Sequence, residues 1–251
     1  MILHHIERGQ GTPVVLLGSI ASDAHMWDPQ IEALSRTHRV IALDHRGHGA
    51  SPDPEVAPGA TTIDELARDV LDTLDSLGVG DFAVAGLSLG GAVAQHLAAT
   101  SGRVTRAAFL CTAPYFGGAE KWAPRAALTR AEGMAPMAEA IFSLWVTPEN
   151  AAAQPEAAEL FRNMIADTRG AGYASCADAL AGWDVRERLH EIAVPVLTIA
   201  GEQDQSTPPA VVHGIAQGAA GPAQSVTVPG AHVPTFESAE LINDALVAFF
   251  S

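Results

Sequence analysis

The pentapeptide Gly86-Leu87-Ser88-Leu89-Gly90 constrains the fold of this chain more than any other segment. It follows an apolar run typical of a buried strand, Phe82 to Ala85, and precedes a helix-like run, Gly91 to Ala99. Small residues around a serine let the backbone turn sharply from strand to helix, because there is little room for Cβ atoms there. Such a nucleophile elbow exposes the hydroxyl and leaves the next backbone N–H free at a helix N-terminus. The segment therefore predicts Ser88 as a nucleophile and the Leu89 N–H as an oxyanion donor.

Two later strand ends supply the other groups that a serine nucleophile needs. Pro195 to Ala200 is typical of a buried strand, and Asp204 follows it after a short turn. Val226 to Val228 is a second strand-like run, and His232 follows it. A base oriented by a carboxylate, in the chain order Ser, Asp, His, is the arrangement expected after a nucleophile elbow. The sequence therefore predicts the catalytic triad Ser88, Asp204 and His232.

Other residues fit these roles less well. Glu202 lies earlier in the same turn as Asp204, where a solvated carboxylate is the simpler interpretation. The strand-like run Ala107 to Leu110 is followed by Cys111-Thr112-Ala113, which contains no carboxylate. His96 and His213 fall within predicted helices, where packing or surface roles are more typical.

The second oxyanion donor is expected in the loop after the first buried strand. That loop is Gly18-Ser19-Ile20-Ala21, and the backbone N–H of Ile20 is the predicted donor. Further along, Asp44 and Arg46 follow a strand and are interpreted as structural tethers for neighbouring loops. No catalytic role is expected for the nearby His45 and His48.

Strand-like and helix-like segments alternate along most of the chain, which predicts an α/β fold with a mostly parallel sheet covered by helices on both faces. Between about Gly117 and Gly182 the pattern changes to Ala-rich helical sequence with no convincing strand. We therefore predict an α/β core in two parts, 1–116 and 184–251, with an inserted helical cap at 117–183. The clearest early elements are strands at Val14–Leu17 and Val40–Leu43 and helices at Trp27–Ser35 and Ile63–Leu77.

Composition excludes several classes of protein. With 251 residues and 48% hydrophobic content the chain can bury a full core. The formal charge of −15 argues against nucleic acid and anionic membranes as partners. Met1 to Arg8 lacks the pattern of a secretory signal, and no apolar stretch is long enough for a membrane span. The two cysteines, Cys111 and Cys176, are expected to be buried free thiols, which favours a reducing, cytoplasmic setting.

A short basic cluster stands out in this acidic chain. The only lysine, Lys121, lies near Arg125 and Arg130. With Pro124 as the first helical residue, Arg125 would lie in the first turn and Arg130 in a later one. The cluster could face an anionic ligand, and a solvated helix face paired with neighbouring glutamates explains the spacing equally well.

The residues together resemble a known family. The chain resembles α/β-hydrolases over nearly its full length and, more narrowly, the 3-oxoadipate enol-lactonases of aromatic degradation. The elbow and the Asp44 loop discriminate little among hydrolases, whereas cap segments vary with substrate and are more telling. The segments that support the narrower resemblance are Ser22–Gln30, Asp44–Ser51, Gly86–Gly91, Trp122–Arg125 through Arg130–Met134, and Gly172–Cys176.

This resemblance implies a serine hydrolase that opens a small anionic enol-lactone through an acyl-enzyme, with no cofactor and no metal. It implies substrate-binding roles for Trp122, Arg125, Arg130 and Trp145, although tryptophans at helical spacing are also typical of a core. Gly18-Ser19 stands where many relatives have His-Gly, and Ala231 before the histidine is a second departure. A carboxylesterase, a cofactor-free perhydrolase and a ligand receptor of the same fold remain alternatives. Whether the chain forms a homo-oligomer is left open.

Overall fold

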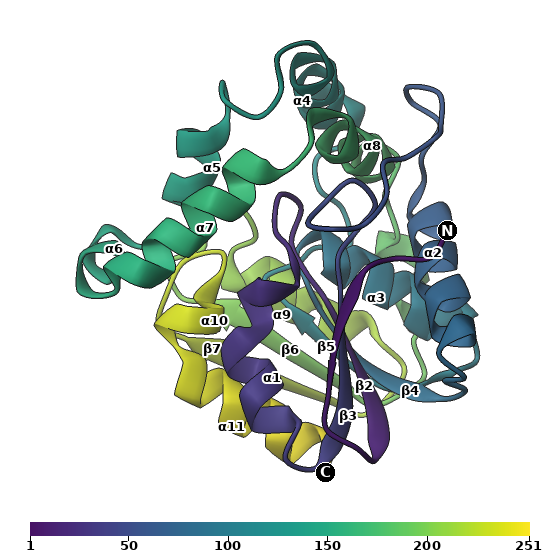
Figure 1. Ribbon diagram of the computed structural model, residues 1–251. Coiled ribbons are helices and arrows are strands. Elements are labelled where there is room, and N and C mark those ends of the chain that lie inside the picture. The colour runs from purple at the N-terminus through teal and green to yellow at the C-terminus, as the bar shows by residue number, and fades with distance from the viewer.

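Seven strands form one sheet in the order β1-β3-β2-β4-β5-β6-β7 (Figure 1). The computed structural model describes residues 1–251. All neighbouring strands are parallel except β1, which runs antiparallel to β3 at one edge. The strands are β1 His5–Arg8, β2 Thr12–Leu17, β3 His38–Leu43, β4 Phe82–Leu87, β5 Val104–Leu110, β6 Val196–Gly201 and β7 Ala223–Val228.

Helices cover both faces of the sheet. α1 packs against α11 on one face, and α2 packs against α3 on the other, where α9 lies along β6 (Figure 1). The predicted fold class is therefore confirmed. The helices of the two layers are α1 Asp28–Leu34, α2 Ile63–Ser76, α3 Leu89–Thr100, α9 Pro209–Gly218, α10 Pro234–Glu237 and α11 Ala239–Phe250, with 3₁₀ helices at Ala24–Trp27 and Arg186–Glu191.

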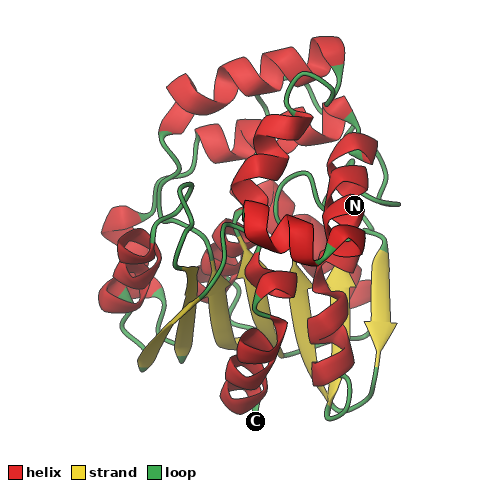
Figure 2. Ribbon diagram, turned by 90° about the vertical axis from the view of Figure 1, so that its left-hand side faces the viewer, coloured by secondary structure: helices red, strands yellow, loops and turns green.

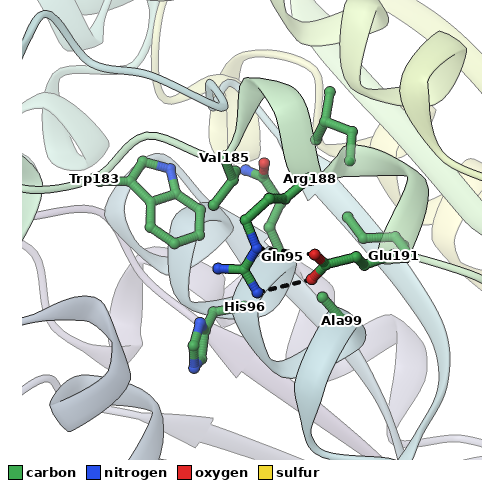
Figure 3. Close-up of a pocket in the computed structure, with 9 residues that line it drawn as sticks. Gln95, His96, Ala99, Trp183, Val185, Arg188 and Glu191 are labelled. Atoms are coloured by element: carbon green, nitrogen blue, oxygen red, sulfur yellow. Dashed lines mark hydrogen bonds and ion pairs between the residues drawn. The ribbon is translucent and has the colours of Figure 1, made fainter.

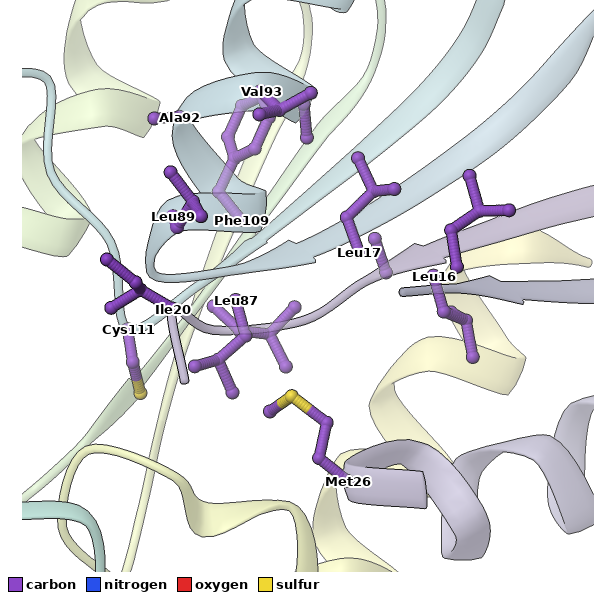
Figure 4. Close-up of a cluster of buried hydrophobic side chains, with 14 of the residues drawn as sticks. Leu16, Leu17, Ile20, Met26, Leu87, Leu89, Ala92, Val93, Phe109 and Cys111 are labelled. Carbon is purple, nitrogen blue, oxygen red and sulfur yellow. The ribbon is translucent and has the colours of Figure 1, made fainter. Parts of the chain in front are cut away.

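The central strands are apolar because they are buried on both sides. Every residue of β4 and of β6 is buried, as expected for a parallel sheet between two helical layers. Side chains from β2, β4, β5 and α3 gather around the turn that contains Ser88 (Figure 4). The turn therefore rests on a rigid core. β7 is mostly exposed because it is the edge strand, and its sequence is correspondingly more polar.

Five helices lie between β5 and β6 and sit above one end of the sheet (Figures 1 and 2). Their bounds are α4 Gly118–Glu132, α5 Ala138–Trp145, α6 Pro148–Ala153, α7 Pro155–Asp167 and α8 Gly170–Ala181. α4 and α8 pack along each other, and α5 packs against α7.

The start of α4 differs from the expectation. Pro124 was predicted as the first helical residue, but α4 begins at Gly118 and Pro124 lies inside it. A proline at this position removes the N–H that would bond to the Glu120 carbonyl, yet the flanking turns continue the helix. As a result Lys121, rather than Arg125, lies in the first turn.

Both cysteines are buried free thiols, as expected. Burial raises the pKa of Cys176 to about 12, and burial also raises the pKa of Cys111 well above its usual value. None of the helices combines the length and the hydropathy that a membrane crossing requires.

Candidate active site

The turn after β4 holds Ser88 in an unusual backbone conformation. Its φ is 55° and its ψ is −113°, a region that side-chain-bearing residues seldom adopt. A Cβ atom at Gly86 would overlap the carbonyl group of Gly90, and one at Gly90 would overlap the carbonyl group of Leu17. Glycine is therefore required at both positions for the strand to turn directly into α3.

Ser88, His232 and Asp204 form a continuous hydrogen-bonded chain. The Nδ1–H of His232 donates to Asp204 Oδ2 at 2.8 Å, and Ser88 Oγ lies 2.9 Å from His232 Nε2. With Nδ1 protonated toward the carboxylate, Nε2 is the acceptor for the serine hydroxyl. All three side chains are buried. This geometry allows the imidazole to take the hydroxyl proton as the oxygen attacks a carbonyl carbon.

The surroundings of Asp204 keep it ionised. Burial alone would raise the pKa of Asp204, but the charge of His232 and hydrogen bonds from His232 and Thr207 outweigh it, so the pKa is lowered. Oδ1 accepts the backbone N–H groups of Ser206 (2.8 Å) and Thr207 (3.0 Å), and Oδ2 accepts the Thr207 hydroxyl (2.7 Å). The carboxylate is thus fixed in position and can orient the imidazole.

Two backbone N–H groups near Ser88 have no acceptor within the protein. They belong to Leu89, the first residue of α3, and Ile20, which lines the cavity beside Ser88. The Gly90 N–H donates to the Gly18 carbonyl at 3.0 Å, which ties the Ile20 loop to the elbow. His45 Nε2 lies 2.9 Å from the same carbonyl oxygen, which gives the loop a second fixed contact. Free N–H groups held this way can stabilise a developing oxyanion.

A cavity of about 240 Å³ opens onto Ser88 and His232. Its wall combines apolar and aromatic side chains with two cations, which suits a small ligand that is partly apolar and anionic. Besides Ser88 and His232, the lining residues are Ser19, Ile20, Phe116, Lys121, Trp122, Arg125, Ile141, Leu144, Trp145, Tyr173, Gln205 and Ser206.

Comparison with known proteins identifies the family of the chain. A family model described as the alpha/beta hydrolase fold matches residues 12–239. The chain belongs to the α/β-hydrolase fold family. This α/β hydrolase is 37% identical to 3-oxoadipate enol-lactonase 2 of Acinetobacter baylyi over 77% of its own length and 72% of that protein. Its structure resembles that of the enol-lactonase from Burkholderia xenovorans LB400, with a TM-score of 0.93, 35% identity, and coverage of 99% of this chain and 96% of that one.

Relatives of other activities share the scaffold. The hydrolase is 28% identical to a putative carbamate hydrolase, RutD, of Azorhizobium caulinodans, over 98% of its own length and 94% of that protein. Family membership therefore shows a hydrolase fold, while the choice of substrate depends on the residues around the cavity.

The structure separates the predicted substrate-binding residues of this hydrolase into two groups. Trp122, Arg125 and Trp145 line the cavity. Arg130 does not, and its guanidinium pairs with Asp178 of α8. Five residues after Arg125 on a helix of 3.6 residues per turn, Arg130 points to a different side of α4, where a carboxylate neutralises it.

Tyr173 and Lys121 line the cavity but are not among the predicted substrate-binding residues. Tyr173 of α8 is fully buried; burial raises its pKa, although Arg125 opposes this effect. Lys121 was recognised as basic, but its place beside the cavity depends on where α4 begins. Two features of the sequence could have indicated these residues. Gly172–Cys176 is one of the segments that resemble the enol-lactonases, and Lys121 lies one helical turn before Arg125.

The loop after β3 in this hydrolase holds neighbouring segments in place through the side chains of Asp44 and Arg46. Asp44 accepts the backbone N–H groups of Ala24 (2.7 Å) and Ala50 (2.9 Å), and Arg46 pairs with Asp69 at 2.7 Å. These bonds agree with the structural interpretation of Asp44 and Arg46. Burial lowers the pKa of His48 to about 3, with a further contribution from His45.

The loop that contains His232 is bonded to the helices above the sheet. The backbone N–H groups of His232 and Val233 donate to the carbonyls of Leu144 (3.2 Å) and Trp145 (2.9 Å) at the end of α5. Glu237 accepts the Ala231 N–H at 2.7 Å and, through its other oxygen, the N–H and hydroxyl of Thr147, each at 2.7 Å. One hydrogen-bond network therefore holds both His232 and the cavity wall formed by Leu144 and Trp145.

A second, smaller cavity lies away from Ser88, between α3 and the 183–192 segment (Figure 3). Its wall includes Trp183 and His96, and the Arg188–Glu191 ion pair lies beside it. Its volume of about 10 Å³ corresponds to a single water molecule, so it is too small for a substrate.

Proposed function

We propose that this protein is a serine hydrolase that opens a small anionic lactone, 3-oxoadipate enol-lactone, to 3-oxoadipate. The observation that carries the proposal is the hydrogen-bonded chain Ser88–His232–Asp204 at the floor of a cavity that also contains Arg125. The similarity to 3-oxoadipate enol-lactonases supports the choice of substrate. The helices at 117–183 act as the cap that shapes this cavity.

In the first half of the reaction, Ser88 Oγ attacks the lactone carbonyl carbon while His232 Nε2 takes its proton. The Ile20 and Leu89 N–H groups hold the negative carbonyl oxygen of the tetrahedral intermediate. When that intermediate collapses, the ring C–O bond breaks and an enolate leaves. The enolate takes the proton from His232 and ketonises, so the acyl-enzyme carries the opened chain.

In the second half, His232 takes a proton from water, whose oxygen attacks the acyl carbon. Collapse of the second intermediate expels Ser88 Oγ, which recovers its proton from His232, and 3-oxoadipate is released. Arg125 holds the substrate carboxylate throughout, because a guanidinium suits two-point binding of a carboxylate.

The first test compares kcat/KM for 3-oxoadipate enol-lactone with that for an uncharged p-nitrophenyl ester. The wild type should prefer the lactone, and Ser88→Ala should lower turnover of both substrates by several orders of magnitude. Arg125→Met should lower kcat/KM about tenfold to a hundredfold for the lactone and leave the ester unaffected.

Other outcomes point to the alternatives. Preference for the ester would keep the triad and replace the lactonase assignment by a carboxylesterase. A single turnover with retained product would indicate a ligand receptor. An active Ser88→Ala variant would contradict the proposed nucleophile.

A further inference from the structure

Two cations in this acidic protein have no carboxylate partner and face the same cavity. The chain has 29 acidic and 14 basic residues, and most of its arginines form ion pairs. Lys121 and Arg125 form none, yet both line the cavity above Ser88. With acidic residues twice as numerous, two adjacent unpaired cations indicate a site kept free for an anion from outside the protein.

Their placement is unfavourable for the helix itself. Lys121 and Arg125 are four residues apart on α4, where like charges repel each other and destabilise the helix. Lys121 also lies in the first helical turn, where the helix dipole disfavours a positive charge. Partial burial, together with the positive charge of Arg125, lowers the pKa of Lys121. Residues that destabilise their own helix and have no carboxylate partner to offset the loss are typical of functional positions.

The two side chains occupy different depths of the cavity. Lys121 is exposed, Arg125 is half-buried and Trp122 is buried. Lys121 Nζ lies 5.6 Å and Arg125 Cζ 5.1 Å from the centre of the Trp122 ring. Both cations lie near the same indole ring, and Lys121 is the more exposed of the two, so an anion that arrives from solvent reaches the lysine first.

We propose that Lys121 is a specificity-determining residue that recruits the carboxylate of the substrate at the cavity mouth and passes it to Arg125. This inference rests on the proposed function and adds a residue to it. The net charge of −15 repels an anionic substrate at long range. The rate constant for substrate association therefore depends on positive charge close to the cavity. Lys121 therefore acts mainly on association, whereas Arg125 acts on the bound state.

The test is Lys121→Met, which keeps the length of the side chain and removes its charge. We expect kcat/KM for the enol-lactone to fall about threefold to tenfold with kcat unchanged, and the difference in kcat/KM between the variant and the wild type to shrink as salt is added, because salt screens the charge of Lys121. The rate with the uncharged ester should stay the same. Lys121→Arg should restore the lactone rate.

The matched control is Arg8→Met. Arg8 is exposed on β1, is in no ion pair and does not line the cavity, so its replacement changes the net charge alone. If Arg8→Met lowered lactone capture as much as Lys121→Met, net charge would explain the effect and the inference would be overturned. It would also be overturned if Lys121→Met matched the wild type while Arg125→Met lost the lactone preference, and the proposed function would then stand. A wild type without preference for the lactone would instead contradict the proposed function.

Discussion

The neighbours of Asp204 hold it in its charged form. Its two oxygens accept four hydrogen bonds, two on each oxygen. An asparagine can accept on one side only, so Asp204→Asn must turn an N–H group toward a donor. The variant should lose the orientation of His232, and kcat should fall by several orders of magnitude.

The same residue predicts a pH dependence of stability. Because the pKa of Asp204 is lowered in the folded protein from its usual 3.8, its charge stabilises the fold above about pH 4, and this contribution is lost as the pH falls through the lowered value. We expect the difference in unfolding free energy between wild type and Asp204→Asn to be constant at higher pH and to narrow in strong acid. Urea unfolding across a pH series measures it. Asp81→Asn, at an exposed site, is the control, and a difference that narrows near neutral pH would contradict the prediction.

Residues at strand ends could be predicted from the sequence because parallel strands bring their carboxyl ends to one edge of the sheet. Ser88, Asp204 and His232 each follow such an end, so a parallel sheet places all three at the same edge whatever the exact strand order. Whether Arg125 or Arg130 faces the cavity depends instead on the angle at which each side chain leaves the helix axis. The two differ in environment because of their angle around α4, which the sequence pattern left open.

Among the elements, the hydrogen bonds between α10 and the start of α6 connect the helices above the sheet to the loop that contains His232. Glu237 of α10 holds both the loop before His232 and Thr147 at the start of α6. Glu237→Gln turns an N–H group toward one of these donors and should lower the unfolding free energy by about 1.5–3 kcal/mol. Because the loop positions His232, kcat should also fall about tenfold or more with little change in KM.

The control for this prediction is Glu240→Gln. Glu240 is exposed in the first turn of α11 and makes no side-chain hydrogen bond, so the variant should lose only its interaction with the helix dipole, less than about 1 kcal/mol of unfolding free energy, and keep its kcat. Assays at a temperature where every variant is fully folded separate the two effects. Normal kcat for Glu237→Gln under those conditions would show that Glu237 stabilises the fold without positioning the base.

The elements of the core were more predictable than those of the insertion. Buried strands such as β4 and β6 are short apolar runs between turns, and their positions agree with the sequence pattern within a few residues. The insertion is rich in alanine, which favours helix everywhere and marks no boundary. Its division into five helices depends on packing between them, as with α4 and α8.

Across the whole molecule, the sheet order could not be read from the sequence, because alternation of strands and helices does not specify which strands are neighbours. The structure places β1 at one edge, antiparallel to β3, and β7 at the other. It also places two histidines, His45 and His48, in the interior, with ring centres 6.1 Å apart. Nothing in the sequence marked them as buried, since histidines are common at the surface as well.

These buried histidines predict how the molecule responds to acid. Burial lowers the pKa of His45, and burial and His45 lower the pKa of His48 from 6.5 to about 3. Both histidines therefore become protonated near pH 6.5 in the unfolded chain but stay neutral in the folded protein at that pH. As a result the unfolding free energy should fall as the pH drops below 6.5, by up to about 1.4 kcal/mol per pH unit for each histidine. His48→Gln keeps a donor for the Arg46 carbonyl, which His48 Nδ1 bonds at 2.9 Å, and removes the titration.

The slope of unfolding free energy against pH should accordingly be shallower for His48→Gln than for the wild type by about 1.4 kcal/mol per pH unit between about pH 6 and 4. Neutralisation of the surface carboxylates affects both proteins equally, so the difference between them isolates the buried imidazole. His190→Gln, at an exposed site, should leave the slope as it is in the wild type. Equal slopes for the wild type and His48→Gln would mean that the folded protein protonates His48 as readily as the unfolded chain does, and another group would then have to explain any loss of stability in acid.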